Sequence, residues 1–334
     1  MTKEVTSKDV EKLGRNDLKE GASSLNKVHD YDQCWEKGAI RVINCRSCGF
    51  KHLDPIPTEQ EIAEFYQRDY YEKTFPFNYD QVNDEYIKAK TESISKNQKY
   101  SDILLKVNEL IRPLQNQTSK RMLDIGCGND LLSKFFQIEG WESYAVEPSF
   151  SASQMLQKFG VPVYNSFIDE KLSLPIKDVS FVNLQHVLEH VRTPIEVLKT
   201  IGSSMHSGAI LRVLVPNDFS EIQLAYNEFY NEEMHWIQYP DHINYFSFSD
   251  LSELLSRNGF RVVYKTTTFP VDFLLLYGIN YYRDEEDRKK VQPFISNFQN
   301  SFLKTGRKEL LDQFYESLAE LGFGRSIVIF AQKE

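Results

Sequence analysis

The stretch Arg121–Asn129 places an acid and two glycines directly after a run of apolar residues. Its sequence is Arg-Met-Leu-Asp-Ile-Gly-Cys-Gly-Asn, and a helix-like pattern follows from Leu131. This order predicts a buried strand, a tight turn and the start of a helix, which is a common place to hold a nucleotide-like ligand. Gly126 and Gly128 let the backbone turn sharply and let a ligand approach where a Cβ would clash. A dinucleotide fingerprint would need a third glycine at position 131, so a pyrophosphate site is not expected.

Two further segments carry polar residues at the ends of predicted strands. Trp141–Pro148 is typical of a second strand that ends in Glu147, about twenty residues after the glycines, where an acid accepts both ribose hydroxyls in a doubly wound sheet. Phe181–Val191 is a predicted strand followed by His186-Val-Leu-Glu-His190. Singly, these features would also suit an ordinary turn, a solvated acid, or two histidines that pack, cap or bind metal on one helical face. Their order and spacing favour one βαβαβ ligand site.

The three segments together resemble the class I S-adenosylmethionine (SAM) methyltransferases. Leu123–Gly128 resembles their motif I, and the His-Val-Leu-Glu-His run resembles the segment after their fourth strand, although Val179-Ser180 stands where the family usually has Phe-Asp. The resemblance covers about residues 120–265 and implies an α/β fold with a doubly wound, seven-stranded Rossmann-like sheet. It implies that the methionine portion of SAM meets the glycine turn, the ribose meets the acid and the adenine meets residues after the third strand. The implied SAM-binding residues are Asp124, Gly126, Cys127, Gly128, Glu147, Pro148, Phe167, Ile168, Gln185 and His186.

A histidine-rich loop, His235–Phe246, is expected after the fifth strand. It resembles the loop "HW…PDHINYF" of methyltransferases with a similar N-terminal segment, and it would cover the acceptor. A histidine whose pKa lies near neutrality suits a general base that removes a proton from the acceptor. The alternatives are that His242 holds the loop by hydrogen bonding and that Trp236 only packs in the core. The candidate catalytic residues are His242, His235, His186 and Tyr245.

The N-terminal cysteines predict a zinc-ribbon-like segment. Cys-x2-Cys-Gly after a short strand is half of a zinc ribbon. The segment resembles the ribbon found on many bacterial methyltransferases of sugar and surface-glycan pathways, except that Tyr31 stands where the first cysteine of the family should be. The alternative is a ribbon that has lost its metal. The candidate zinc ligands are Cys34, Cys45, Cys48 and His29, with His52 as the other possible fourth ligand.

Composition limits the function classes. The net charge of −9 and the pI of about 5.4 argue against a broad basic surface for nucleic acid. The N-terminal residues have no apolar signal-peptide core, and the longest apolar run, Phe269–Ile279, is too short for a membrane span and contains Asp272. We therefore expect a cytoplasmic protein whose four cysteines are thiols or metal ligands.

Hydrophobic periodicity predicts the order of elements around these motifs. Thr58 and Glu61 form a capping box, Thr193 caps a helix with proline in its first turn, and one helix-like stretch covers about 86–111. Strands are expected near 121–126, 142–147, 161–164, 179–184, 209–215, 260–268 and 325–332, and helices near 130–139, 150–159, 193–205 and 249–258. The expected segments are a loose N-terminus (1–25), the ribbon (26–57), a helical region (58–118), the SAM-binding core (119–268), a helical cap (269–324) and a final core strand (325–334).

Two classes of function remain. The first is SAM-dependent methyl transfer to a small polar acceptor, preferably a sugar nucleotide or glycan precursor, with a quinone-type or other small-molecule O-methyltransferase as the alternative. The second is a non-catalytic SAM-binding protein. Leu131 in place of a third glycine disfavours an NAD enzyme. The acidic composition disfavours methylation of nucleic acid, and the sequence leaves the oligomeric state open.

Overall fold

The chain forms two compact units, and neither is one continuous stretch of sequence. The computed structural model describes residues 29–65, 79–111, 120–168, 174 and 176–334, so the expected segment 1–25 lies outside the described residues. Each unit is built from segments that are far apart in sequence. The first unit contains the described residues of Met1–Phe65 with Pro216–Glu253 and Lys265–Ile327; the second contains the described residues of Tyr66–Val215 with Leu254–Tyr264 and Val328–Glu334.

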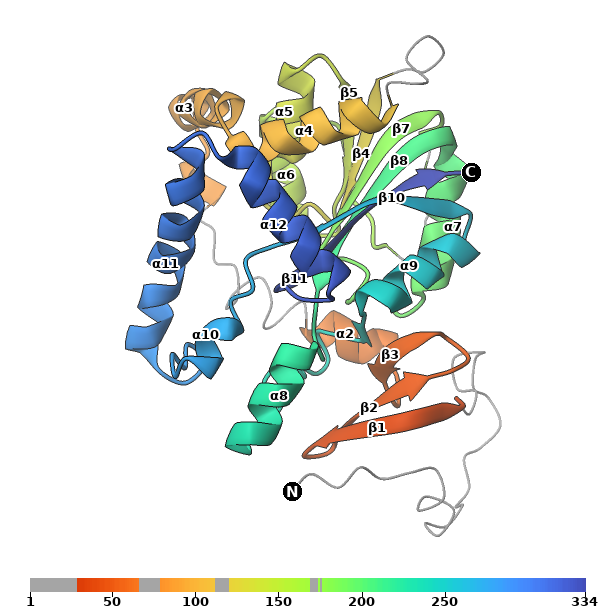
Figure 1. Ribbon diagram of the computed structural model, residues 1–334. Helices are drawn as coiled ribbons and strands as arrows, with labels where there is room; N and C mark the ends of the chain where they lie inside the picture. Colours follow the sequence, from red (N-terminus) through yellow and green to blue (C-terminus); the bar gives the residue numbers. More distant parts are fainter. Residues whose placement is uncertain (1–28, 66–78, 112–119, 169–173, 175) are drawn as a thin grey trace, which may run out of the picture. The chain divides into compact units, whose positions relative to one another are not determined.

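A seven-stranded sheet has the order β10-β11-β8-β7-β4-β5-β6, which confirms the expected doubly wound architecture (Figure 1). β4 pairs in parallel with β5 and β7, β7 with β8, and β5 with β6. All seven expected strands are present. Their bounds are β4 Arg121–Ile125, β5 Glu142–Val146, β6 Val163–Tyr164, β7 Val179–Gln185, β8 Met205–Pro216, β10 Phe260–Thr267 and β11 Ser326–Lys333.

The strand order makes the carboxyl end of β4 the topological switch point of the sheet. The chain continues from β4 to β5 on one side, and it returns to β7 on the other side of β4. Helices that follow the two strands must then lie on opposite faces, so the loops at this end diverge and leave room for a ligand. The glycine turn follows β4, and Gln185 ends β7. The four expected helices are α5 Leu132–Ile138, α6 Phe150–Lys158, α7 Pro194–Ser204 and α9 Phe248–Arg257.

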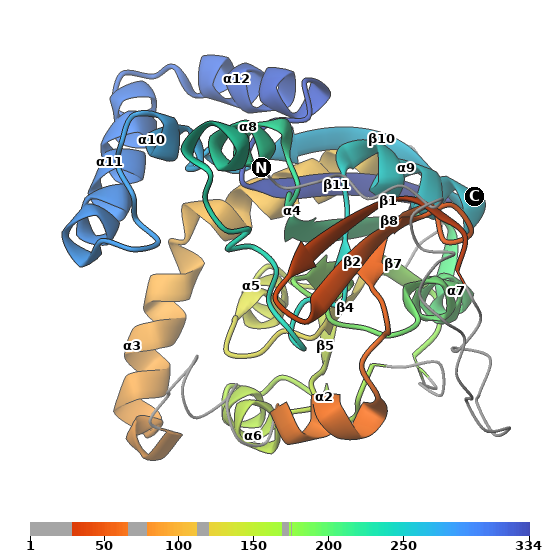
Figure 2. The same ribbon diagram turned by 90° about the horizontal axis from the view of Figure 1, so that it is seen from below.

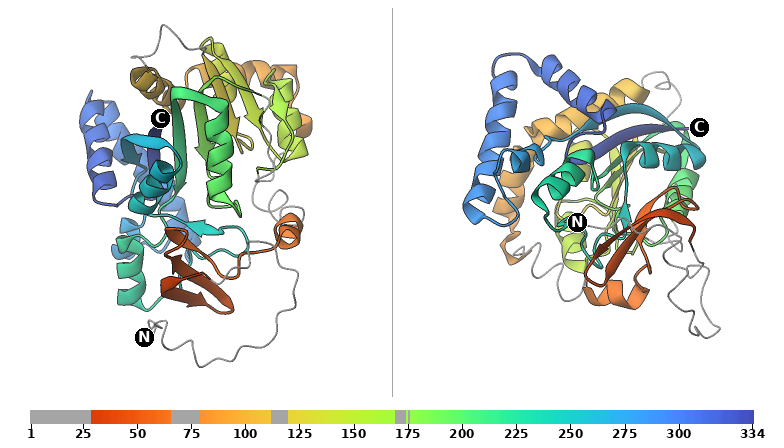
Figure 3. Two further views of the ribbon diagram at one scale, coloured as in Figure 1. Left: turned by 90° about the vertical axis from the view of Figure 1, so that its right-hand side faces the viewer. Right: turned by 60° about the horizontal axis from the view of Figure 1, so that its bottom comes forward.

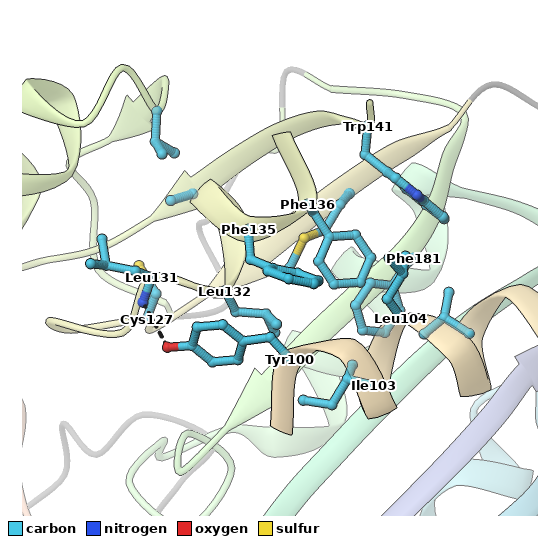
Figure 4. Packing of buried hydrophobic residues seen from close by; sticks show 14 of the residues in the cluster. Tyr100, Ile103, Leu104, Cys127, Leu131, Leu132, Phe135, Phe136, Trp141 and Phe181 are labelled. Atoms are coloured by element: carbon cyan, nitrogen blue, oxygen red, sulfur yellow. Dashed lines mark hydrogen bonds between the residues drawn. The ribbon is translucent and has the colours of Figure 1, made fainter. Parts of the chain in front are cut away.

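One apolar core joins this sheet to the helices α4 (Gln98–Ile111) and α5. Phe136 of α5 stacks on Phe181 of β7 with ring centroids 5.2 Å apart, and Trp141 meets the ring of Phe136 edge-on (Figure 4). The hydroxyl of Tyr100 accepts a hydrogen bond from the backbone amide of Leu131 at 3.4 Å. This core therefore anchors the residue with which the helix after the glycine turn begins.

The expected single helix-like stretch over 86–111 is wrong in one respect, because the structure contains two helices there. α3 spans Asp84–Ser95, and α4 spans Gln98–Ile111. The side chain of Asn97 accepts a hydrogen bond from the amide of Tyr100 at 3.2 Å, which is a helix-capping contact that starts a new helix. A short 3₁₀ turn, η3 Tyr79–Gln81, precedes α3.

In the first unit a four-stranded sheet has the order β1-β2-β3-β9. Figure 2 labels its strands β1 and β2, and Figure 3 shows the same red strands from two further sides. Trp236, Tyr245 and Phe219 pack on one another in the core of this unit. Thr58 and Glu61 form the expected capping box at the start of the helix that follows. The bounds are β1 Tyr31–Lys37, β2 Ile40–Cys45, β3 Phe50–Leu53, β9 Asn244–Tyr245 and α2 Glu59–Phe65.

The expected cap, residues 269–324, belongs to the first unit and is helical. It has its own apolar cluster, which includes Phe269 and Tyr315. A further helix, α8 Glu221–Tyr230, follows β8 in a stretch that we expected to be loop; Ser220 caps it by accepting from the amide of Gln223. Thr193 makes no capping hydrogen bond, in contrast to the expectation, although Pro194 does open α7. Among the described residues, no helix is both long and apolar enough to cross a membrane. The cap helices are α10 Phe273–Leu276, α11 Glu285–Leu303 and α12 Lys308–Glu320.

Candidate functional site

The turn after β4 has the backbone that its glycines predict. Gly126 has φ of +66° and Gly128 has φ of +53°, a region that side chains other than glycine rarely adopt. A Cβ at Gly126 would lie 2.6 Å from Cγ2 of Val187, so a side chain there would force the next loop to move. A Cβ at Gly128 would meet nothing within 4 Å. The first glycine therefore serves packing, and the second leaves its surroundings open for a ligand.

Glu147 ties the end of β5 to this turn. Its Oε2 accepts from the amide of Gly128 at 2.7 Å, its Oε1 accepts from the amide of Ser149 at 2.8 Å, and the side chain is buried. A carboxylate offers about four lone-pair sites, which is the acceptor chemistry that ribose hydroxyls require. The structure thus brings Glu147 and the glycine turn together, as expected for one ligand site.

A polar row crosses the sheet beside the turn. Asp124 of β4, Asn183 of β7 and Arg212 of β8 are successive register partners. Nδ2 of Asn183 donates to Oδ1 of Asp124 at 2.7 Å, and Nη1 of Arg212 donates to Oδ1 of Asn183 at 2.6 Å. Gln185 joins the row because its Oε1 accepts from Nη1 of Arg212 at 3.3 Å.

The electrostatics of Asp124 favour a cationic ligand. Burial, followed by the negative charge of Asp130, raises the pKa of Asp124 to about 7, although Asn183 and Arg212 oppose this shift. Its Oδ2 is buried and has no hydrogen-bond partner among the described residues. An ammonium group at this oxygen would both satisfy it and stabilise the carboxylate, so the site fits the amino-acid portion of SAM.

The remaining residues that were expected to bind SAM differ in exposure. Cys127 is buried, and burial raises the pKa of its thiol well above the usual value, which makes it a packing residue in the neutral form. Ile168 lies beside Gly126, because its Cδ1 would be 3.4 Å from a Cβ there. Phe167 is 60% exposed, and Pro148 directly follows Glu147. The exposed ring of Phe167 is available for an adenine but packs against little in the protein.

His186 is not on a helix, which removes the idea of two histidines on one helical face. The residue has φ of +55°, and its Nδ1 lies 3.0 Å from Oε1 of the buried Glu189. A positive φ at a non-glycine residue is uncommon and costs free energy, so the surrounding contacts must hold it. This geometry fixes the imidazole at the end of β7, directly after Gln185.

His242 of the histidine-rich loop His235–Phe246 lies beside a buried pair of charges within the first unit. Oδ1 of Asp218 accepts from Nη1 of Arg325 at 2.7 Å, and Nδ1 of His242 lies 3.3 Å from Oδ2 of Asp218. Burial alone would raise the pKa of Asp218, but Arg325 and His242 outweigh it and hold that pKa below its usual range. An ionised carboxylate thus lies beside Nδ1 of His242 and orients its ring.

The other loop candidates are more enclosed. The ring of His235 packs on Tyr282 of the cap with centroids 3.3 Å apart, and burial followed by Arg325 lowers the pKa of His235 to about 3. Tyr245 and Trp236 are about 1% exposed and belong to the core of the four-stranded sheet. Burial also raises the pKa of Tyr245. Of this group, His235 and His242 have the more polar surroundings.

The structure gathers two cysteines and two histidines at the four-stranded sheet. The ligand atoms of His29, Cys45, Cys48 and His52 all lie within 4.8 Å of one another. Nδ1 of His29 is 3.2 Å from Sγ of Cys45 and 3.5 Å from Sγ of Cys48. Nδ1 of His52 donates to the carbonyl of Leu53 at 2.8 Å, and its Nε2 is buried with no hydrogen-bond partner among the described residues. Imidazole nitrogens and cysteine sulfurs, which bind as thiolates, are ligands that zinc prefers.

Cys34 is not in this group. Three cysteines and one histidine were expected, whereas the group has two of each, with His52 in place of Cys34. Cys34 and His52 are both register partners of Ile43, on either side of β2. The imidazole extends further from its strand than a thiol, which has a single heavy atom beyond Cβ. This difference in reach explains why His52 joins Cys45 and Cys48 whereas Cys34 does not.

Several residues of these sites were missed from the sequence. Arg212 offered a signal, because it is the charged residue within the apolar run Ala209–Val215, and a buried charge requires partners. Asp218 and Arg325 offered none, since more than a hundred residues separate them and only the fold brings them together. Tyr282 of the cap likewise meets His235 only through tertiary structure.

Solved structures similar to the chain include a SAM-dependent methyltransferase from Archaeoglobus fulgidus, with 23% identity over 69% of this chain and 93% of that one and a TM-score of 0.42. Another is a 1,6-didemethyltoxoflavin-N1-methyltransferase from Burkholderia thailandensis, with 13% identity, coverage of 90% and 97%, and a TM-score of 0.46. A third is the magnesium protoporphyrin IX methyltransferase from Synechocystis, with 14% identity, coverage of 83% and 100%, and a TM-score of 0.45. No curated protein has significant sequence similarity to this chain.

The family model described as "Methyltransferase domain" matches residues 96–265. That match spans just over half of the 334 residues. It includes the glycine turn, Glu147 and all five strands from β4 to β8. The chain therefore belongs to this methyltransferase domain family and is an enzyme that uses SAM as its methyl donor.

Proposed function

We propose that the protein transfers the methyl group of SAM to a small polar acceptor, with a sugar nucleotide or glycan precursor as the preferred class. The observation that carries the proposal is the pair formed by Asp218 and His242, next to Arg325. A polar acceptor such as a hydroxyl group must lose a proton during methylation, and an oriented imidazole suits that task. A non-catalytic SAM-binding protein would have no need of such a pair.

The residues of the pair have separate roles in this proposal. SAM supplies the electrophilic methyl group when it is bound. His242 takes the proton of the acceptor, and Asp218 stabilises the resulting imidazolium through Nδ1. Arg325 keeps Asp218 ionised, so that the carboxylate does not take the proton itself. On the donor side, we propose that Asp124 contacts the ammonium group of SAM and that Glu147 contacts its ribose.

The test is transfer of label from methyl-labelled SAM to a panel of acceptors. The panel contains nucleotide sugars and, as the alternative class, quinone-type phenols. Label on a nucleotide sugar, absent when His242 is replaced by Gln, supports the proposal. Label on phenols alone would assign the alternative O-methyltransferase function. Tight SAM binding without transfer to any acceptor would favour a binding protein.

We also propose that His29, Cys45, Cys48 and His52 hold one Zn²⁺. The hydrogen bond from Nδ1 of His52 to a backbone carbonyl supports this, because it leaves the lone pair on the buried Nε2 and orients the ring as second-shell contacts do in zinc sites. Four such ligands complete a tetrahedral structural site. The metal would stabilise the small four-stranded sheet.

Elemental analysis of protein purified without a metal-affinity tag should then find about one zinc per chain. Cys45→Ser should remove the metal and lower the melting temperature, whereas Cys34→Ser is the matched control and should change neither. A metal-free protein whose melting temperature is unaffected by chelators would contradict the zinc proposal.

A further inference from the structure

Arg212 is a buried cation whose partners are amides. Its side chain lies on β8 between apolar neighbours, and the residue is 4% exposed. Nη1 donates to the side-chain oxygens of Asn183 and Gln185, and the ring of Phe330 lies 5.9 Å from the guanidinium carbon. A buried charge is costly when it lacks a direct counter-ion, and an apolar residue would suit the fold of this strand better. The position therefore requires an explanation beyond stability.

The guanidinium determines which way the two amides point. Arginine has only donors, so each amide must present its oxygen to Arg212. The NH₂ group of Asn183 is then directed to Asp124, to which it donates at 2.7 Å. The NH₂ group of Gln185 is likewise left as a donor on its other side. Without Arg212, only the carboxylate of Asp124 would hold Asn183 in this orientation, and a protonated Asp124 could instead donate to the oxygen of Asn183.

The row ends at an oxygen that no protein group satisfies. Oδ1 of Asp124 accepts from Asn183, and its buried Oδ2 has no hydrogen-bond partner among the described residues. The described groups that interact electrostatically with Asp124 include Asp130, Glu147, Tyr100 and Cys127, none of which supplies a positive charge. Arg212 does supply one, and it acts on Asp124 through one intervening amide.

We propose that Arg212 is a positioning residue for the amino-acid portion of SAM, which it serves by orienting the amides of Asn183 and Gln185 and so keeping Oδ2 of Asp124 ready for the ammonium group. The proposal rests on the contact between Asp124 and SAM proposed above. It goes beyond that contact, because Arg212 touches neither the cofactor nor the acceptor in this scheme.

The experiment compares two ligands that differ only in the amino-acid portion. S-adenosylhomocysteine has it, whereas 5′-methylthioadenosine has the same adenosine and sulfur without it. Calorimetry measures both affinities for the wild type, for Arg212→Met and for Arg261→Met, a control that removes an exposed arginine from β10 of the same sheet. Arg212→Met should weaken S-adenosylhomocysteine by roughly 10- to 100-fold, the effect of losing a hydrogen bond to a charged group, and 5′-methylthioadenosine by less than about 3-fold.

Two further variants keep the test valid if Arg212→Met fails to fold. Arg212→Lys keeps the charge but offers no planar fork for two amide oxygens, so it should give an intermediate selective loss and partly rescue the affinity for S-adenosylhomocysteine. Asn183→Asp is isosteric and places a second carboxylate against Asp124, so it should weaken S-adenosylhomocysteine selectively and shift the pH dependence of its binding towards higher pH.

Three outcomes would overturn the inference. Equal losses for both ligands in the Arg212 variants would make Arg212 a general support of the pocket. Unchanged affinity for both ligands would remove its role altogether. Loss of 5′-methylthioadenosine binding in Asn183→Asp would show that the row serves adenosine. Because 5′-methylthioadenosine does not use Asp124 in this scheme, a wild type that binds both ligands equally would refute the Asp124 contact itself, separately from the role of Arg212.

Discussion

Both compact units contain a buried carboxylate and an arginine, yet the two pairs are connected differently. In the first unit Arg325 contacts Asp218 directly, at 2.7 Å. In the second unit an amide separates Arg212 from Asp124. The pKa of Asp218 is held below its usual range, whereas burial raises the pKa of Asp124 to about 7 in spite of Arg212.

The comparison shows that an intervening amide transmits orientation but little charge. A carboxylate in direct contact with a guanidinium gains enough Coulomb energy to outweigh its desolvation, so it remains an anion. A carboxylate one residue further away stays near the point of protonation until a cation binds. The first arrangement suits a permanent partner for His242, and the second suits a site that a cationic ligand completes.

The largest effect is expected from His242→Gln. If His242 takes the acceptor proton, turnover should fall by roughly a hundred- to ten-thousand-fold, because one acid–base group is lost. Affinity for SAM should stay nearly unchanged, and the melting temperature should fall little. Rate, affinity and melting temperature are measured on the same samples. The control is His206→Gln, a change in β8 outside the loop His235–Phe246.

His235→Gln tests the other histidine of the loop. Its low pKa keeps it neutral, so it can accept a hydrogen bond but has little basicity. We therefore expect a smaller loss of turnover than for His242→Gln. Full turnover in both variants would show that the loop holds no catalytic base, and His186 would be the next candidate.

The second effect concerns stability. Removing the carboxylate should destabilise the protein at Asp218 but not at Asp124. Asp218→Asn leaves Arg325 without its anion and should lower the free energy of unfolding by about 3 kcal/mol, the lower end for a broken buried pair. The lower end is expected because the side chain of Arg325 is 26% exposed and water replaces part of the contact. Asp124→Asn should be neutral or stabilising, since it removes a charge that burial disfavours. Urea unfolding at neutral pH measures both.

The third effect tests the donor side with Glu147→Ala. This change removes the acceptor for the amides of Gly128 and Ser149 as well as the proposed partner of the ribose. Binding of S-adenosylhomocysteine should weaken by roughly 1.5–3 kcal/mol, as for a lost charge-assisted hydrogen bond. Calorimetry provides the measurement, and unchanged affinity would show that Glu147 only shapes the turn.

The smallest effect is the pH dependence, and it separates the two carboxylates. Asp124 must be ionised to hold a cation, so affinity for S-adenosylhomocysteine should fall as pH drops below about 7, by at most tenfold per pH unit for one proton. The depressed pKa of Asp218 affects stability in a more acidic range. Its contribution to the free energy of unfolding is present above the unfolded-state pKa of 3.8 and is lost as pH falls below that value. Asp124→Asn should flatten the first profile, and Asp218→Asn should flatten the acid limb of the melting curve.

The donor half of the protein could be predicted because its information is local. An apolar run, an acid and two glycines specify a strand, a turn and a helix start within Arg121–Asn129. The same holds for Glu147 at the end of its strand and for the positions of the seven strands along the chain, which the local hydrophobic pattern indicates. The break between α3 and α4 was missed because the capping contact of Asn97 has the strength of one hydrogen bond and competes with an unbroken periodic pattern.

The sequence by itself therefore determined the class of fold, the SAM-binding motif and the presence of thiols and imidazoles near the N-terminus. Only the tertiary structure decided which of these groups meet. It chose His52 instead of Cys34, joined Asp218 to Arg325, and placed Asn183 between Asp124 and Arg212. The physical reason is that hydrogen bonds and ion pairs act over a few ångströms in space, whereas the residues that form them lie up to about a hundred positions apart in the chain. Register and packing set those distances, and neither can be read from one segment alone.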